Sequence, residues 1–293
     1  MILEIILLTV AIIWLISASL FDIKTREIPD WLNYSLILMA FFIRGLMSIT
    51  TKNPSYIITS LIGFAVLFGF ANLMYYTKQW GGGDAKLAIA FGILFASYPE
   101  TLLKIFTPNL NVPFLLSIFI NVLIIGAIFS IFYSIYLSLK NKEKYLNEHR
   151  KIIKNKSLKF LEIFSILIFI ILTTIVLIFV QNTILKILLI LIFAFPLIFI
   201  YIYLFVKVVE KITMYKTVKT SNLTEGDWII QDIKIKNKLI YSSKSPGVTK
   251  KQIQELIKSK IKTVKIKEGI PFVPSFLIGL IISLIFGNLI LPI

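Results

Sequence analysis

The chain has 293 residues, of which 57% are hydrophobic and only 16% are charged, and its mean hydropathy is +0.88. This composition excludes an ordinary soluble domain and is typical of a protein that lies in a lipid bilayer. The formal net charge is +16, and the absence of cysteine excludes disulfides, cysteine-ligated zinc and cysteine nucleophiles. His149 is the one histidine, so a histidine-based metal site or catalytic triad has little to build on, and we expect no metal and no cofactor.

Long apolar stretches predict several membrane-spanning helices. A spanning helix needs about 20 mainly apolar residues. The sequence offers such stretches at residues 1–21, 34–50, 56–77, 85–103, 112–139, 160–180, 183–208 and 270–292. We therefore predict an all-α polytopic membrane protein with about eight transmembrane helices.

The basic residues gather in alternate loops of this predicted topology. If the N-terminus lies outside, the cytoplasmic loops hold most lysines and arginines, and the opposite loops hold Arg44, Lys52, Lys104 and Lys186. Since cytoplasmic loops of membrane proteins carry the excess of Lys and Arg, this orientation is the expected one. The excess of basic residues then sets the orientation of the chain in the lipid bilayer, where anionic lipids attract it. We therefore expect no nucleic-acid partner.

Two hydrophilic inserts interrupt the apolar chain. The first is a basic cytoplasmic linker, interpreted as an orientation signal. The second contains the strand-like segments DWIIQDIKI, KLIYSSK and TVKIK and a helical segment with Thr249 as a plausible N-cap, which predicts a small cytoplasmic α+β insert before the last helix. We therefore divide the chain into five parts. They are a membrane core with two acidic motifs (1–139), the linker (140–159), two further transmembrane helices (160–208), the α+β module (209–269) and a C-terminal transmembrane helix (270–293).

Two aspartates lie at the ends of predicted spans. Asp22 ends the first span within SLFDIKTREIPDW, and Asp84 begins the fourth within QWGGGDAKLAIAFG. Because a charge at mid-bilayer costs roughly 2.5–3.5 kcal/mol, function is the usual reason for an acid in such a place. Two carboxylates at the same membrane depth can share one proton, so that one activates water and the other stabilises an oxyanion. This arrangement is typical of an aspartic peptidase.

Three glycines, Gly81, Gly82 and Gly83, precede Asp84 directly. Glycine permits positive φ angles and lets an extended substrate approach the backbone without Cβ contacts, so these residues are candidates for substrate binding. The alternative is a flexible loop followed by a helix N-cap. The spacing alone does not decide between the two.

Together the two motifs resemble a known family. Asp22-Ile-Lys-Thr-Arg-Glu-Ile-Pro29 and Gly81-Gly-Gly-Asp-Ala-Lys-Leu87 look like the motifs of the type IV prepilin peptidases, the GxGD membrane aspartic proteases, and most of all their archaeal preflagellin (archaellin) branch. The resemblance implies that Asp22 and Asp84 are catalytic. It also implies that the partners are archaellin or type IV pilin-like precursors, whose short basic leader is removed at the cytoplasmic membrane face. Bacterial members carry a cysteine-rich insert and also methylate the product, so in this cysteine-free chain we expect no N-methyltransferase activity.

Further candidates flank these motifs. The segment containing Pro271 and Pro274 is similar to a GIPF-type element of the archaeal members. By analogy with the PAL-like element of presenilin-type proteases, we expect this backbone beside the active site, where it contacts substrate. The alternative is simple helix entry, since proline is tolerated in a first turn. Glu27 and Asp30 share the loop of Asp22, where they form a solvated face or bind the basic residues of the leader.

Other classes of function stay open. Paired membrane acids also occur in proton- or cation-coupled transporters. A non-catalytic component of the pilus or archaellum machinery, or a presenilin-like protease that cuts within a substrate helix, is a further alternative. Inverted repeats and mid-membrane acids are not evident, and both aspartates are present with the glycines before Asp84, so we favour the leader peptidase.

Overall fold

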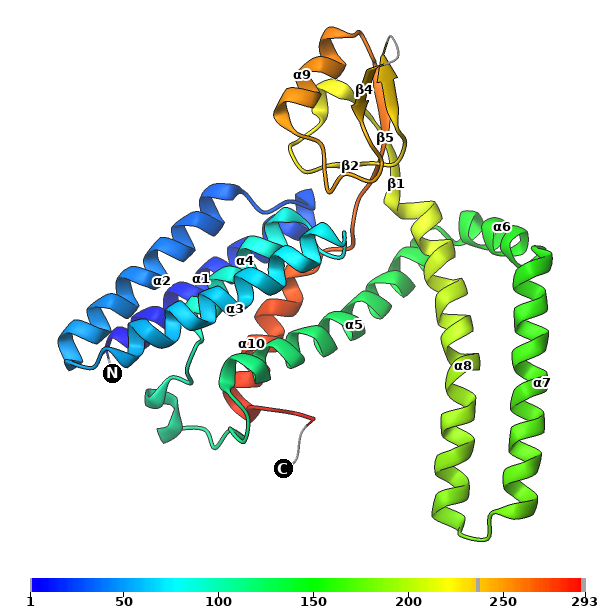
Figure 1. The fold of residues 1–293 in the computed structure, drawn as a ribbon, viewed down its shortest axis with the longest axis horizontal. Coiled ribbons are helices and arrows are strands. Elements are labelled where there is room, and N and C mark those ends of the chain that lie inside the picture. The colour runs from blue at the N-terminus through cyan, green and yellow to red at the C-terminus, as the bar shows by residue number, and fades with distance from the viewer. Residues whose placement is uncertain (1, 236–237, 291–293) are drawn as a thin grey trace. The chain divides into compact units, whose positions relative to one another are not determined.

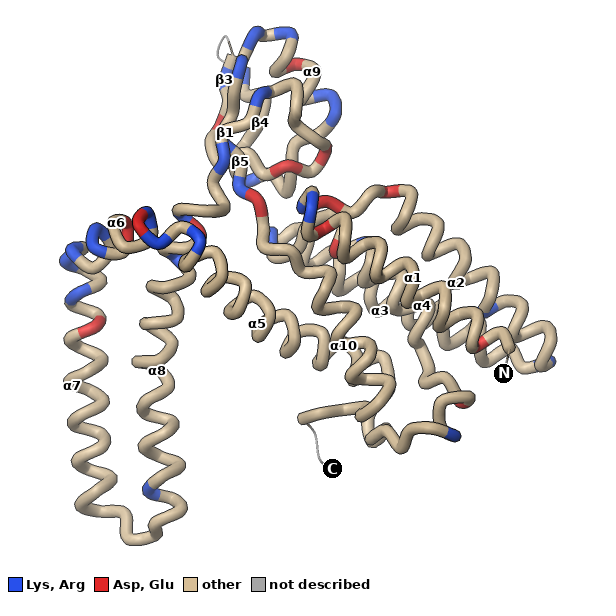
Figure 2. The backbone as a smooth tube through the Cα atoms, turned by 180° about the vertical axis from the view of Figure 1, so that it is seen from behind, with Lys and Arg blue, Asp and Glu red and all other residues tan. Residues whose placement is uncertain are grey.

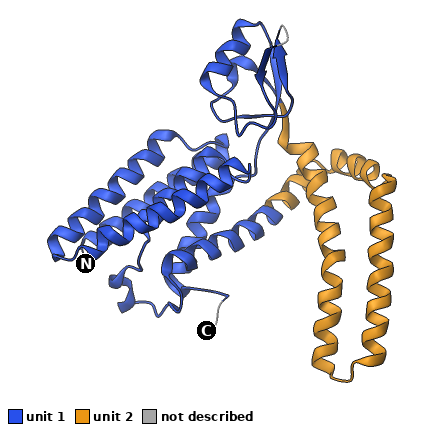
Figure 3. Ribbon diagram, viewed as in Figure 1, with its two compact units in different colours: residues 1–132, 217–293 blue, residues 133–216 orange. Residues whose placement is uncertain are grey.

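The computed structural model describes residues 2–235 and 238–290, which are mostly helical (Figure 1). The chain forms two compact units, residues 1–132 with 217–293 and residues 133–216 (Figure 3). Among the described residues, six helices are long and apolar enough to cross a membrane. They are α1 (Ile2–Thr25), α2 (Asp30–Thr51), α3 (Ser55–Tyr76), α5 (Phe114–Lys140), α7 (Lys156–Phe179) and α8 (Thr183–Val209). The predicted class, a helical multi-pass membrane protein, is confirmed.

Two of the eight predicted spans form shorter helices. Helix α4 (Gly82–Leu94) has 13 residues and helix α10 (Val273–Phe286) has 14. At 1.5 Å per residue each is about 20 Å long, which is less than the roughly 30 Å of hydrocarbon in a bilayer. After α4 the chain turns and forms a short 3-10 helix, η1 (Glu100–Lys104), where the sequence predicted a continuous span. The count of eight spanning helices is therefore not confirmed.

Arg44 accounts for the early end of α4. We predicted Arg44 in an outer loop, which was wrong, because it lies within α2 and is 2% exposed. Its guanidinium donates to the carbonyl of Leu94 and, at 3.2 Å, to the hydroxyl of Ser97. The last carbonyls of a helix lack intrahelical partners, and a bilayer offers no water to replace them. Arg44 therefore satisfies the C-terminal end of α4 inside the protein.

Small residues let the helices of the first unit pack closely. Helices α3 and α4 meet at Gly63 and Gly92, where a Cβ added to Gly63 would lie 2.0 Å from the Gly92 carbonyl oxygen. Helix α10 packs against α5 in the same way, since a Cβ on Gly279 would lie 2.7 Å from the side chain of Val122. In lipid, such close van der Waals packing is a main source of helix association.

The α+β insert precedes the last helix, as predicted. A three-stranded sheet has the order β1-β5-β2, from β1 (Tyr215–Lys219), β5 (Thr263–Lys267) and β2 (Trp228–Ile229). A second, antiparallel pair joins β3 (Ile233–Ile235) and β4 (Lys238–Tyr241). The short 3-10 helix η3 (Thr220–Asn222) follows β1, and helix α9 (Lys250–Lys258) begins at Thr249. The Thr249 hydroxyl accepts from the Gln252 N–H at 3.3 Å, which confirms the predicted cap.

The second unit begins in α5 and is helical almost throughout. It contains α6 (Lys142–Ile153), α7, α8 and one π-helical turn, η2 (Glu210–Met214). Helices α7 and α8 are joined by a hydrogen bond of 2.8 Å from the Tyr201 hydroxyl to Glu162. Lysines and arginines gather in α6, in the insert and at helix ends, whereas the apolar spans carry almost no charge (Figure 2).

Candidate functional site

Asp22 lies in the last turn of α1, where its side chain is 6% exposed. The helix ends because Arg26 adopts a left-handed backbone with φ of 63° and donates its N–H to the Asp22 carbonyl at 3.0 Å. The Asp22 carboxylate accepts from the backbone N–H of Val273 at 2.9 Å, and the side chain of Arg26 lies within electrostatic reach. A backbone donor and a cation therefore both face this carboxylate.

Asp84 is the third residue of α4. Gly81 is the N-cap, and its N–H donates to the Asp84 carboxylate at 3.2 Å in a capping-box arrangement. A negative charge is favourable at this end of a helix, because the free N–H groups make it partly positive. The loop alternative considered for Gly82 and Gly83 was wrong, since both residues belong to the helix.

The three glycines provide room and do not supply unusual backbone angles. The positive-φ glycines among the described residues are Gly226 and Gly287, so the predicted use of positive φ before Asp84 was wrong. A Cβ on Gly83 would instead lie 3.1 Å from the side chain of Ile28. The small size of Gly83 therefore allows α4 to begin close to the loop that follows α1.

The two aspartates approach each other from different helices. Asp22 ends α1, Asp84 begins α4, and the two carboxylates lie within electrostatic reach of each other. Among residues 2–235 and 238–290, no group of three or more His, Cys, Asp or Glu side chains could hold a metal ion. The arrangement is a pair of acids with separate backbone donors, which suits proton transfer to and from a water molecule.

The segment before α10 supplies the donor to Asp22. Phe272 is the N-cap of α10, and Pro274 stands in its first turn. The N–H of Val273, the first helical residue, has no partner within the helix and is donated to Asp22. The backbone between Pro271 and Pro274 therefore lies beside Asp22, while the prolines themselves mark the entry of the helix.

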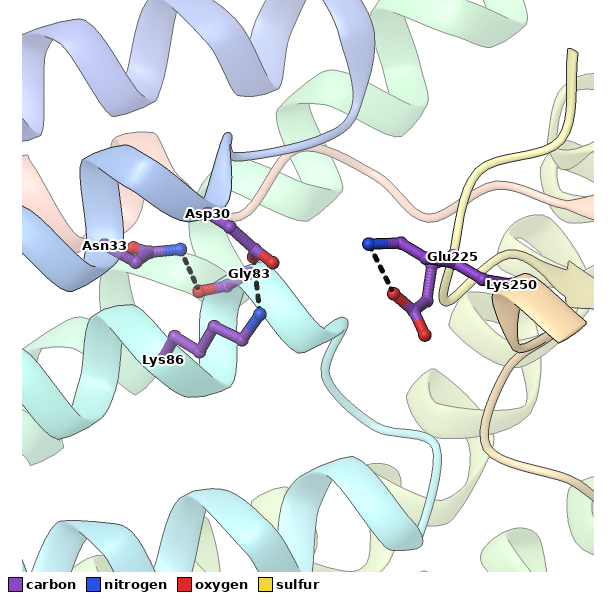
Figure 4. A network of polar contacts seen from close by, with 6 residues as sticks. All are labelled: Asp30, Asn33, Gly83, Lys86, Glu225 and Lys250. Atoms are coloured by element: carbon purple, nitrogen blue, oxygen red, sulfur yellow. Dashed lines mark hydrogen bonds and ion pairs between the residues drawn. The ribbon is translucent and has the colours of Figure 1, made fainter.

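Glu27 and Asp30 both have protein partners. Asp30 forms an ion pair of 2.5 Å with Lys86 of α4 (Figure 4). Glu27 accepts from the hydroxyl of Thr224 in the α+β insert. The insert also touches the loop after α3, where Lys78 donates to the carbonyl of Ser243 at 2.5 Å. The insert therefore contacts the loop that follows Asp22 and the loop that precedes Asp84.

Asn33 was missed by the sequence analysis. It lies in α2, is 1% exposed, and donates its side-chain amide to the carbonyl of Gly83 at 3.4 Å (Figure 4). The available signal was an amide within a mostly apolar helix, three residues after Asp30. Trp80, which is 5% exposed, was also missed, and its ring packs against Phe272 at 5.8 Å between centroids.

Comparison with known proteins shows what the segment that holds this site is similar to. Residues 9–135 match the model of the type IV leader peptidase family, and the matched segment includes Asp22 and Asp84. Through this segment, which is less than half of its length, the chain is similar to the type IV leader peptidase family.

Curated relatives of the chain include three archaeal proteins. A preflagellin peptidase of Methanocaldococcus jannaschii is 33% identical over 132 residues, which are 45% of this chain and 56% of the relative. A preflagellin peptidase of Methanococcus voltae is 32% identical over 149 residues, 48% of this chain and 62% of the relative. A prepilin peptidase of Methanothermobacter thermautotrophicus is 24% identical over 153 residues, 50% of this chain and 40% of the relative. The chain thus spans less than two thirds of each of these relatives, and no solved structure matches it.

Proposed function

We propose that this chain is a membrane aspartic endopeptidase that removes the short basic leader from archaellin or type IV pilin-like precursors. Asp22 and Asp84 are the proposed catalytic pair. The observation that carries the proposal is the electrostatic proximity of two carboxylates that belong to different helices. The family of residues 9–135 and the names of the preflagellin peptidase relatives support the choice of substrate class.

The proposed reaction is hydrolysis of one peptide bond by the pair. Two nearby carboxylates hold one proton between them, because ionising both is costly. The ionised member takes a proton from water as the oxygen attacks the peptide carbonyl, and the protonated member hydrogen-bonds to the developing oxyanion. When the tetrahedral intermediate collapses, the carbon–nitrogen bond breaks and the leaving nitrogen receives a proton from the pair. The products are a carboxyl group on the leader and a free amine on the mature protein.

The remaining site residues have proposed roles in substrate binding. Gly81, Gly82 and Gly83 leave room for an extended substrate backbone beside Asp84. The backbone between Pro271 and Pro274, which contacts Asp22, is proposed to border the same substrate peptide. Glu27 and Asp30 provide negative charge for the basic leader. Binding there competes with the contacts to Thr224 and Lys86.

We further propose that the reaction takes place at the cytoplasmic face of the cell membrane. The distribution of lysine and arginine favours an outside N-terminus, which puts the end of α1 and the start of α4 on the cytoplasmic side. The basic leader of a newly made precursor is available on that side. Water reaches the acidic pair from there as well.

The test is cleavage of a precursor panel by the wild-type protein in membranes. Archaellin and type IV pilin-like precursors are incubated with the wild type or with Asp84→Asn, and the new N-terminus is located by mass spectrometry. The proposal predicts a cut between the basic leader and the apolar segment that follows it, and no cut with the variant. A wild type that cleaves none of the precursors would reopen the transporter and assembly-component alternatives. A cut inside the apolar segment would instead indicate a presenilin-like activity.

A further inference from the structure

Asn33 is a buried amide whose hydrogen-bonding capacity is only partly used. Its side chain is 1% exposed, and its oxygen has no hydrogen-bond partner among the described residues. Its nitrogen reaches the Gly83 carbonyl at 3.4 Å, a long hydrogen bond (Figure 4). An apolar side chain of the same size would avoid the cost of burying an unpaired polar atom. Packing stability therefore does not explain why an amide stands here.

The position of the bond suggests another role. The Gly83 carbonyl belongs to the peptide group that joins Gly83 to Asp84. On the other side of this peptide, the Asp84 carboxylate is bonded to the N–H of Gly81 at 3.2 Å. Ile28 packs against Gly83 so closely that a Cβ would lie 3.1 Å from its side chain. Asn33 and Ile28, which lie outside α4, thus both contact Gly83, whose peptide group carries Asp84.

We propose that Asn33 is a positioning residue for Asp84. It acts through the Gly83 peptide and fixes the direction in which the Asp84 carboxylate faces Asp22. This inference rests on the proposed function, because it assigns to Asn33 a part in the same reaction. The Asp30–Lys86 ion pair joins the same two helices, but its side chains are 63% and 29% exposed. Solvent screens such a pair, so it holds α4 less firmly than a buried contact.

The test separates positioning from stability. Asn33→Leu keeps the volume of the side chain and removes its polar atoms. Since small displacements of a catalytic group can lower rates about 100-fold, we expect kcat for precursor cleavage to fall about 10- to 100-fold. We expect KM to change less than about 3-fold, because uniform binding of the substrate is retained. The thermal unfolding midpoint should stay unchanged or rise, because the unpaired amide is gone.

Two further variants complete the experiment. Asn33→Gln restores an amide donor and should recover part of the lost kcat. Asn72→Leu is the matched control, because the amide of Asn72 in α3 donates at 2.7 Å to Phe68 of its own helix and not to α4. Its kcat should equal that of the wild type.

Each outcome decides one question. If Asn33→Leu cleaves with the wild-type kcat, or if it unfolds at a lower temperature or fails to fold, Asn33 is a structural residue and the inference is overturned. Wild-type protein and Asp84→Asn are assayed in parallel. Absence of cleavage by the wild type would overturn the proposed function itself. An Asn33→Leu variant as active as the wild type would overturn the role of Asn33 alone.

Discussion

Asp22 and Asp84 each accept a hydrogen bond from a backbone N–H, and the two donors lie at very different distances along the chain. The donor to Asp22 is Val273, 251 residues further along the chain, whereas the donor to Asp84 is Gly81, three residues before it. The orientation of Asp22 therefore depends on how α10 docks against α1, while that of Asp84 is set within the first turn of α4. Changes at the entry of α10 should disturb Asp22 first.

Asp227 in the α+β insert provides a pH-dependent test of the structure. Burial raises the pKa of the Asp227 carboxyl, the N–H of Thr224 partly offsets this, and the nearby Glu27 carboxylate raises the pKa further. The folded pKa thus lies above the unfolded value, so the stability that the bound proton confers is lost as the pH rises through the folded pKa.

We predict that Asp227→Asn raises the thermal unfolding midpoint near pH 7, because a neutral side chain removes the cost of a partly desolvated charge. The Asn oxygen can still accept the Thr224 N–H, which lies 2.8 Å from the carboxylate. Well below the ordinary aspartate pKa of about 3.9 both side chains are neutral, and the midpoints should agree. Tryptophan fluorescence can follow the transition, since Trp228 is adjacent. The same shift at both pH values would contradict the half-buried placement of Asp227.

At the scale of single residues, the sequence indicates acids more readily than amides. Asp22 and Asp84 are conspicuous because charge is rare in apolar spans, and the structure has them within electrostatic reach. Asn33 and Arg44 could not be predicted in the same way. Their partners are the carbonyls of Gly83 and Leu94, and a backbone acceptor leaves no trace in the sequence.

At the scale of elements, the contact between α3 and α4 decides where the acidic pair forms. Gly63 and Gly92 let the two backbones approach so closely that neither position has room for a Cβ, since a Cβ on Gly92 would lie 2.3 Å from the Gly63 carbonyl. The register of α4 along α3 is therefore tied to these two glycines, and Asp84 is carried by the same short helix.

We predict that Gly63→Ala destabilises the protein by about 1–3 kcal/mol, because the new methyl group forces α3 and α4 apart. Cleavage should fall with it. Gly69→Ala in the same helix is the control, because nothing lies within 4 Å of its added Cβ. That change should be neutral or stabilise the helix by up to about 1 kcal/mol. Thermal unfolding of both variants measures the difference, and equal midpoints would contradict the close glycine contact.

The lengths of the elements show what hydropathy can and cannot predict. The apolar run at 85–103 is long enough to suggest a full span, yet α4 ends at Leu94. Hydropathy reports the length of an apolar run, whereas the end of a helix depends on what satisfies its last carbonyls. In this chain Arg44 does so from a neighbouring helix.

At the scale of the whole molecule, the match to the type IV leader peptidase family and the compact units divide the chain in similar ways. The matched residues 9–135 lie almost entirely in the first unit, and the second unit, residues 133–216, lies almost entirely outside them. The α+β insert belongs to the first unit. It touches the loops beside the acidic pair through Thr224 and Ser243, and it leads directly into α10. We therefore expect the insert to contribute to the site, in contrast to α7 and α8.

The absence of cysteine makes the orientation directly testable, since a single introduced cysteine is the sole thiol. With the N-terminus outside, Lys52→Cys after α2 should react with a membrane-impermeant maleimide added to intact cells. Lys142→Cys at the start of α6 should react only after the membrane is opened. Both positions are exposed in the structure. The reverse pattern of labelling would place the acidic pair on the outer face.

The central claim is that Asp22 and Asp84 act as one catalytic pair, and the most direct measurement compares kcat for Asp22→Asn, Asp84→Asn and the double variant on one precursor. An unfolding midpoint equal to that of the wild type shows that each variant is folded. Because members of a catalytic unit are strongly non-additive, we predict that each single change lowers kcat by roughly 10³-fold or more and that the double change lowers it no further. The claim would be contradicted if the double variant lost kcat by the product of the two single losses, or if either single variant cleaved with the wild-type kcat.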